Sequence, residues 1–170
     1  MAVTSWDPRN PRIQPHAGGS IPQIVYGRDE DASETFKAGE LVYLDATGQV
    51  NSIPDSSGGT VPVAGIAMKD ATTTSASNAI EIPIMMITPE TEILIQVANN
   101  SGTLEASDAA CYPGLAYDLQ AVSTNLQYIN SFDKTNPLFV YVGPVLNAAG
   151  ASTYWGRFRL KYVESQFTAE

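Results

Sequence analysis

The chain has 170 residues, a length that fits one ordinary domain with an ordered arm and leaves little room for two independent cores. Apolar residues make up 44% of it, whereas charged residues make up only 16%, below the roughly one quarter found in most proteins. The net charge of −9 belongs to an acidic body, since positions 38–156 hold eleven acidic residues against two basic ones, Lys69 and Lys134. Nucleic-acid binding needs a basic face, so we expect no nucleic-acid partner.

A single cysteine, Cys111, excludes an intramolecular disulfide and is compatible with a reducing cytoplasm. No stretch approaches the roughly 18 consecutive apolar residues that a membrane-spanning helix needs, so we expect no membrane partner. Residues 1–7 form neither a basic nor an apolar segment, and we therefore expect no cleaved export signal.

Residues 1–35 are predicted to form an extended arm, because Pro8, Pro11, Pro15 and Pro22 exclude a helix and a central strand there. The segment is too apolar for a linker that stays in water, although disorder is the alternative. We expect the arm to dock onto the body or onto another chain. The residues predicted to make this contact are Trp6, Arg9, Arg12, Ile13, Ile21, Ile24 and Tyr26.

Alternation of apolar and polar residues predicts β-strands over most of residues 36–170. The clearest segment is 154–162, in which Phe158 and Leu160 alternate with Arg157 and Arg159. No window of a dozen residues has the period of a helix. Short strands separated by turn clusters predict an all-β fold, a single barrel or sandwich. The other predicted strands are residues 41–44, 61–68, 80–87, 92–97, 126–129 and 138–142.

The apolar strand at residues 80–87 is predicted to lie at a sheet edge or to be bulged, because Pro83 has no N–H to donate. An exposed apolar edge promotes aggregation unless another chain covers it, so the segment favours an oligomer. The basic residues of the last strand would meet acidic groups of a neighbouring subunit or form a solvated face. The candidate subunit contacts are therefore Ile82, Ile84, Met86, Arg157 and Arg159.

Residue sets suited to catalysis or metal binding are missing from the sequence. The one histidine, His16, lies in the arm, and the neighbours of Cys111 do not suggest an activated thiolate. One His and one Cys cannot build a structural zinc site. We therefore predict no enzyme, no catalytic residues, no metal, no cofactor and no small-molecule substrate. Glycoside hydrolysis, which needs two converging carboxylates, would have to use Asp108, Asp118 and Asp133.

Carbohydrate binding, or adhesion by a module of a phage or surface structure, is the alternative function. Exposed aromatic rings can stack on sugar rings, but the same residues can also belong to a core or to a subunit interface. The candidate rings are Tyr112, Tyr117, Tyr128 and Trp155.

Short patterns of hydrophobic residues and glycine recur along the predicted strands. They are Phe-Lys-Ala-Gly-Glu-Leu-Val-Tyr-Leu-Asp at residues 36–45, Gly-Gln-Val at 48–50, Val-Ala-Gly-Ile-Ala at 63–67, Gly-Leu-Ala-Tyr-Asp-Leu at 114–119 and Gly-Arg-Phe-Arg-Leu at 156–160. These segments resemble the head decoration proteins, or capsid cement proteins, of tailed bacteriophages. The resemblance covers residues 36–163, and the proline-rich arm is not a fixed part of the pattern.

The resemblance implies a barrel or sandwich-like (β-tulip-like) domain that forms a homotrimer on the outer capsid surface of the virion. Such a protein is made in the host cytoplasm and binds the major capsid protein, tying neighbouring capsid subunits together. A trimer contacts several capsid subunits at once, so modest contacts add up to strong avidity. The arm would then contact the capsid or a neighbouring subunit.

Overall fold

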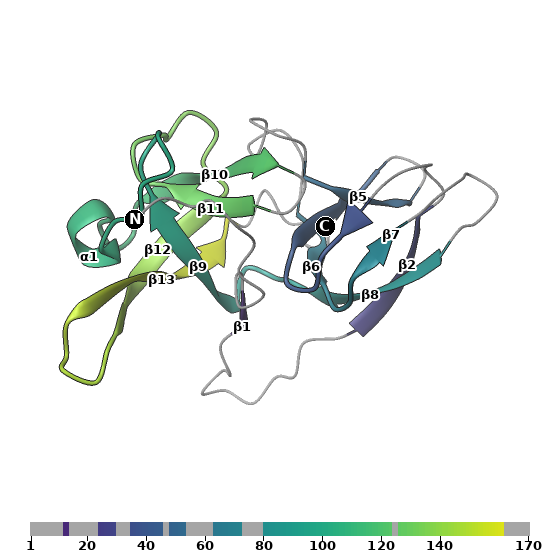
Figure 1. Ribbon diagram of the computed structural model, residues 1–170, viewed down its shortest axis with the longest axis horizontal. Helices are drawn as coiled ribbons and strands as arrows, with labels where there is room; N and C mark the ends of the chain where they lie inside the picture. Colours follow the sequence, from purple (N-terminus) through teal and green to yellow (C-terminus); the bar gives the residue numbers. More distant parts are fainter. Residues whose placement is uncertain are drawn as a thin grey trace.

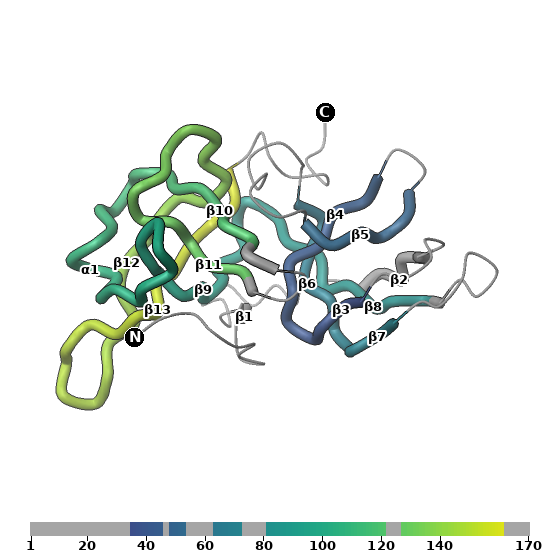
Figure 2. The backbone as a smooth tube through the Cα atoms, turned by 45° about the horizontal axis from the view of Figure 1, so that its top comes forward, coloured from purple at the N-terminus to yellow at the C-terminus, as the bar shows by residue number. Residues whose placement is uncertain are grey.

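The residues that the structure describes form an all-β fold with one short helix, which confirms the predicted fold class. The structure is a computed structural model that describes residues 12–13, 24–29, 35–45, 48–53, 63–72, 80–123 and 126–161. Two halves lie next to each other, a barrel formed by the later strands and a curled sheet formed by the earlier ones (Figures 1 and 2).

The barrel contains five strands in the order β9, β11, β10, β12 and β13, and it closes because β13 also pairs with β9. The β9–β11 pair is parallel and the other pairs are antiparallel. Closure gives the backbone of each strand a partner on both sides, which removes the unpaired edges that promote aggregation. The strands span Glu92–Ala98 (β9), Ala116–Ser123 (β10), Leu126–Asn130 (β11), Phe139–Leu146 (β12) and Ser152–Leu160 (β13).

The second half is a five-stranded sheet in the order β2, β8, β6, β4 and β5. Its outer strands β2 and β5 contact each other, so the sheet curls on itself. A separate two-stranded ladder joins β3 and β7. The bounds are Ile24–Asp29 (β2), Thr35–Phe36 (β3), Leu41–Leu44 (β4), Val50–Ser52 (β5), Gly65–Ala67 (β6), Ala71–Thr72 (β7) and Ile80–Met86 (β8).

The predicted alternation is confirmed in the two long strands that close the barrel. In β13, Phe158 and Leu160 are buried, whereas Arg157 and Arg159 lie on the outer side. In β9 the alternating buried positions are Ile93, Ile95 and Val97, and Ala98 at the end of the strand is buried as well. Tyr154 does not follow the pattern and is 42% exposed. It belongs to the hairpin of β12 and β13, which extends beyond the barrel in Figure 1.

The prediction that residues 80–87 lie at a sheet edge or are bulged is wrong, because β8 lies inside the sheet between β2 and β6 and its pairings with both run without a register shift. The β2 strand pairs with it at six successive positions. The carbonyl of Pro83 accepts a hydrogen bond from the N–H of Met68, which lies just beyond the end of β6. The proline therefore stands where the β6 ladder has already ended, so its missing donor costs the sheet little.

The described parts of the predicted arm pair with strands of the same chain. Strand β1, Arg12–Ile13, pairs with β9, and β2 covers β8. The backbone of Ile24 and Tyr26 belongs to β2, and nothing is described of the side chains of β1 and β2. The remaining predicted contact residues, Trp6, Arg9 and Ile21, lie outside the described residues.

In the described ranges, buried apolar side chains form two clusters. The larger one joins the halves, because Leu41, Ile66 and Ile87 from the region of the curled sheet pack in one cluster with barrel residues. The smaller one lies within the curled sheet and contains Ile82 and Ile84, both fully buried. These two side chains are therefore in the chain's own core and not on its surface. The barrel members of the larger cluster include Ile93, Ile95, Val97, Tyr117, Leu119, Ile129, Phe139, Tyr141, Phe158 and Leu160.

One buried amide connects the barrel to the curled sheet. The side chain of Gln127 in β11 accepts a hydrogen bond from the N–H of Leu41 through Oε1 at 2.7 Å and donates to the Leu41 carbonyl through Nε2 at 2.9 Å. The carbonyls of Glu40 and Val42 instead accept hydrogen bonds from the N–H groups of Ala67 and Ala64 in the β6 segment. Both residues are buried, with Gln127 only 3% exposed. The Gln127 side chain therefore takes the place of a neighbouring strand, because the N–H and carbonyl of Leu41 would otherwise be buried without a hydrogen-bond partner.

We predict that Gln127→Ala lowers the free energy of unfolding by about 3 kcal/mol, because two backbone groups lose their partner and a cavity is left behind. Urea denaturation measures the change. The matched control is Gln120→Ala, since Gln120 is only partly buried and donates to the carbonyl of Ala121 at 3.3 Å. Equal losses in the two variants would contradict the role given to Gln127.

Candidate functional site

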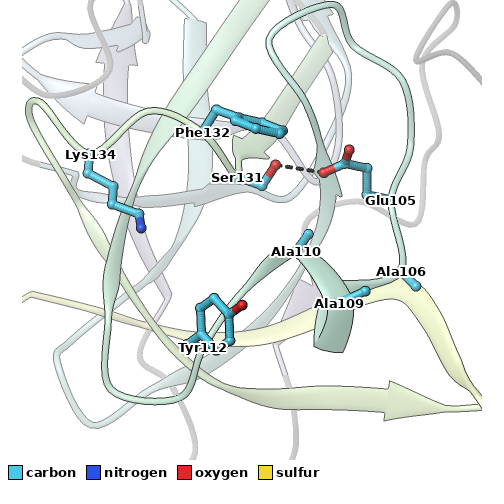
Figure 3. A pocket seen from close by; sticks show the side chains of 8 residues that line it. All are labelled: Glu105, Ala106, Ala109, Ala110, Tyr112, Ser131, Phe132 and Lys134. Carbon is cyan, nitrogen blue, oxygen red and sulfur yellow. Dashed lines mark hydrogen bonds between the residues drawn. The ribbon is translucent and has the colours of Figure 1, made fainter.

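A pocket of about 560 Å³ opens at the end of the barrel where β9 and β11 finish (Figure 3). Its lining comes from the segment between β9 and β10, which includes the short helix α1, and from the loop after β11. The lining residues are Glu105, Ala106, Ala109, Ala110, Tyr112, Ser131, Phe132 and Lys134.

Helix α1, Ser107–Ala110, forms one wall of the pocket and is anchored to the barrel. Ser107 is fully buried, and its hydroxyl donates to the carbonyl of Trp155 in β13 at 2.9 Å. The N–H of Asp108 donates to the hydroxyl of Ser152 at 3.3 Å. These bonds fix a single helical turn that would not be stable alone. The small side chains of the alanines on this wall leave the pocket open.

Two exposed aromatic rings border the pocket. Tyr112 is 62% exposed and Phe132 is 67% exposed, and Figure 3 shows them on opposite sides of the hollow. The N–H of Tyr112 donates to the hydroxyl oxygen of the buried Tyr117 at 2.8 Å. The N–H of Phe132 donates to the side-chain oxygen of Asn130 at 3.1 Å. Both rings are therefore carried by fixed backbone while their faces are open to solvent.

One acidic and one basic side chain complete the pocket. The Glu105 carboxylate accepts a hydrogen bond from the Ser131 hydroxyl at 2.8 Å and one from the Asn99 amide at 3.5 Å. The Lys134 ammonium lies 5.2 Å from the centroid of the Tyr117 ring. No ion pair joins these two pocket residues. The carboxylate and the ammonium are thus held separately, and each can contact a ligand.

Cys111 lies between two lining residues in sequence, but its side chain points into the core and is 1% exposed. Burial raises the pKa of its thiol to about 12, and the charge of Glu105 adds to this effect. The thiol is therefore protonated at neutral pH and is a poor nucleophile. The one histidine of the chain, His16, lies outside the described residues.

Two of the three carboxylates considered for glycoside hydrolysis lie close together. The N–H of Asp118 donates to the carbonyl of Asp133 at 3.2 Å. Burial raises the pKa of Asp118 to about 6, and the neighbouring Asp133 also raises it. The pKa of Asp133 is lowered because its carboxylate accepts hydrogen bonds from Thr135. Asp108 is on α1 beside Ser152, and none of the three acids lines the pocket.

Of the four aromatic residues considered for stacking on a sugar, only Tyr112 lies open at the pocket. For Tyr117 and Tyr128 the other reading, that the rings belong to the protein interior, is confirmed: both are buried, Tyr117 within the larger core cluster. Trp155 is partly buried on β13. Sequence analysis missed Phe132, the second ring of the pocket. It stands in a polar turn after β11, where no periodic pattern distinguishes an exposed ring from a buried one.

The basic residues of β13 pair within the chain. Arg159 contacts the Glu92 carboxylate of the adjacent strand β9 at 2.7 Å, and Arg157 approaches it at 3.8 Å. The acidic partner of Arg157 and Arg159 is therefore Glu92 of the same barrel. These pairs are partly exposed, so each contributes about 0.5 kcal/mol to stability.

Among the described residues, no group of three or more His, Cys, Asp or Glu side chains is placed to hold a metal ion. The helix found in the described part of the chain is too short to cross a membrane. Comparison with known proteins gives no match to a family model, to a curated protein or to a solved structure. The function must therefore be inferred from the chain itself.

We predict that Asp118→Asn stabilises the protein at pH 7 by about 1 kcal/mol, a value reduced for partial exposure of the carboxylate. The folded chain binds this proton more tightly than the unfolded chain, in which the pKa is about 3.8. Protonated Asp118 therefore contributes stability below pH 4 that is lost as the pH rises to about 6. The variant should differ from the unaltered protein at pH 7 but hardly at pH 3.5.

Urea unfolding at the two pH values measures this difference. Asp108→Asn, which removes one negative charge at an exposed acid on α1, is the matched control for the change of charge. An Asp118→Asn protein that is no more stable than the unaltered protein at pH 7 would contradict the prediction.

Proposed function

We propose that the chain is a structural binding protein of the capsid decoration type, which binds the outer surface of a tailed-phage head as a homotrimer and stabilises the shell. The segments that resemble this family fall on regular parts of the structure: residues 41–44 are β4, 65–67 are β6, 116–119 begin β10 and 156–160 end β13. An all-β fold is what that resemblance implies. The proposed partners are the major capsid protein and other copies of the chain.

The observation that carries the proposal is the position of the exposed apolar side chains. Of the six large ones in the described residues, five lie between positions 112 and 154, in the barrel half, and one lies elsewhere. An apolar surface concentrated on one part of a molecule is typical of a contact with another protein. The five are Tyr112, Leu115, Phe132, Leu146 and Tyr154, and the sixth is Met68.

The hairpin of β12 and β13 is the best candidate for the contact. Leu146 is 55% exposed and Tyr154 is 42% exposed at its protruding end. Asn147 orders the turn, because its side-chain oxygen accepts hydrogen bonds from the N–H groups of Ala149 and Ala151. The hydroxyl of Thr153 donates across the hairpin to a carbonyl of β12. A pre-ordered apolar hairpin loses little conformational entropy when it binds.

Binding at several equivalent positions would explain how such a protein stabilises a shell. Each hairpin of a trimer supplies one modest contact, and the linked contacts act together as one strong attachment. A protein that binds only the assembled lattice makes the lattice harder to dissociate. The acidic body is consistent with protein contacts on the outside of a head, away from the packaged nucleic acid.

We predict that the double variant Leu146→Ser, Tyr154→Ser binds expanded phage heads at least tenfold more weakly, because it removes the apolar surface of the hairpin. Cosedimentation with heads measures binding, and analytical ultracentrifugation measures the trimer. The matched control is Met68→Ser, an exposed apolar residue of the other half, which should leave both unchanged. A monomeric chain without affinity for heads would overturn the proposed function.

The arm gives a second test. We predict that removing residues 1–11, which leaves β1 and β2 in place, weakens head binding or trimer formation. A longer deletion through residue 26 would uncover β8, so its effects would not separate binding from folding. Undiminished binding by an intact trimer would show that residues 1–11 take no part.

A further inference from the structure

The pocket at the barrel end has chemistry that capsid attachment does not require. Its two rings, Tyr112 and Phe132, are the most exposed large apolar side chains of the described residues, and they border one hollow from opposite sides (Figure 3). A flat apolar ring attracts ligands that carry a flat apolar face. The C–H faces of a pyranose sugar have this form, and so do nucleobases and aromatic side chains.

The charges in the pocket select among these ligands. Glu105 supplies a negative group and Lys134 a positive one. An anionic ligand would be repelled by Glu105 and a cationic ligand by Lys134. A hydroxyl group both donates and accepts hydrogen bonds, so hydroxyls of one ligand satisfy the carboxylate and the ammonium together. The acidic body of the protein disfavours nucleotides, whose phosphates it repels. A neutral ligand rich in hydroxyls fits best.

The polar groups are ordered before any ligand arrives. The Ser131 hydroxyl has one proton and lies closer to the Glu105 carboxylate, at 2.8 Å, than to the carbonyl of Ala98, at 3.2 Å. Its bond to Glu105 fixes the carboxylate and leaves further acceptor positions on the oxygens. The fully buried Tyr117 ring similarly holds the ammonium of Lys134. Ordering of this kind lowers the entropic cost of binding.

The size and shape of the pocket agree with a sugar. The pocket volume of about 560 Å³ lies within the range of known small-molecule binding sites. The wall formed by Ala106, Ala109 and Ala110 offers small methyl groups against which an apolar substituent can pack. Because both rings are exposed, the ligand can extend out of the pocket as part of a longer chain.

We propose that the pocket between Tyr112 and Phe132 binds a neutral pyranose residue, free or at the end of a glycan, with Glu105 accepting from its hydroxyl groups and Lys134 donating to them. This site goes beyond the proposed attachment to a capsid. It uses pocket residues and not the β12–β13 hairpin, so either function can fail without the other.

Saturation-transfer NMR with the full chain tests the site, using the methyl glycosides of glucose, galactose, mannose and N-acetylglucosamine as probes. At least one should receive magnetisation on its ring protons and bind with a measurable dissociation constant. Tyr112→Ala and Phe132→Ala should each weaken that binding at least fivefold, as should Glu105→Gln or Lys134→Met. The matched control is Tyr154→Ala, which removes an exposed ring outside the pocket and should leave binding unchanged.

Unfolding midpoints of the variants establish that each is folded, and Glu105→Gln keeps the shape of the side chain should an alanine variant fail this check. Absence of transfer to all four glycosides would overturn the proposal. So would equal weakening by Tyr154→Ala, or tighter binding of charged sugars, for which N-acetylneuraminic acid and glucosamine are the probes. Glu105→Gln should still cosediment with phage heads, because Glu105 lines the pocket and is not part of the exposed apolar surface. This variant separates loss of sugar binding from failure of the proposed attachment.

Discussion

The two halves of the molecule depend on one buried amide. Gln127 bonds to both backbone groups of Leu41 and so extends the curled sheet onto a strand of the barrel. Apolar packing between the halves has no direction of its own, whereas these two bonds allow a single register between β4 and β11. The larger core, to which both halves contribute, can then form around this fixed contact. The contact between Gln127 and Leu41 therefore helps to set how the two halves are placed relative to each other.

The closed barrel determines where ligands and partners can bind. Closure uses the backbone groups of its strands, so contact with other molecules depends on side chains and on the segments that leave the barrel. Two such segments stand out: the β12–β13 hairpin, which presents apolar side chains, and the loops after β9 and β11, which form the pocket. The parallel pairing of β9 and β11 brings these two loops together, because both strands finish at the same end of the barrel.

Local patterns in the sequence predicted the fold class and the strands with clear alternation, such as β9 and β13. These patterns failed where the position of a strand or the burial of a side chain depends on residues far away in the sequence. Pro83 indicated an edge, yet β2 covers that strand from nearly sixty positions away in sequence. The sequence left open whether Tyr117 and Tyr128 are exposed or buried, since a local pattern cannot tell which residues the rest of the fold covers. The pocket combines two loops distant in sequence, and Phe132 carried no local signal.

The pairing of the first strands has a consequence for synthesis of the chain. Strands β1 and β2 leave the ribosome early, but their partners β9 and β8 are translated much later. Until then the curled sheet lacks its outer strand β2. Assembly of this half is therefore limited by closure of a long loop, which is slow compared with formation of the local β12–β13 hairpin. Crowded nascent chains are at risk of exchanging β2 during this interval.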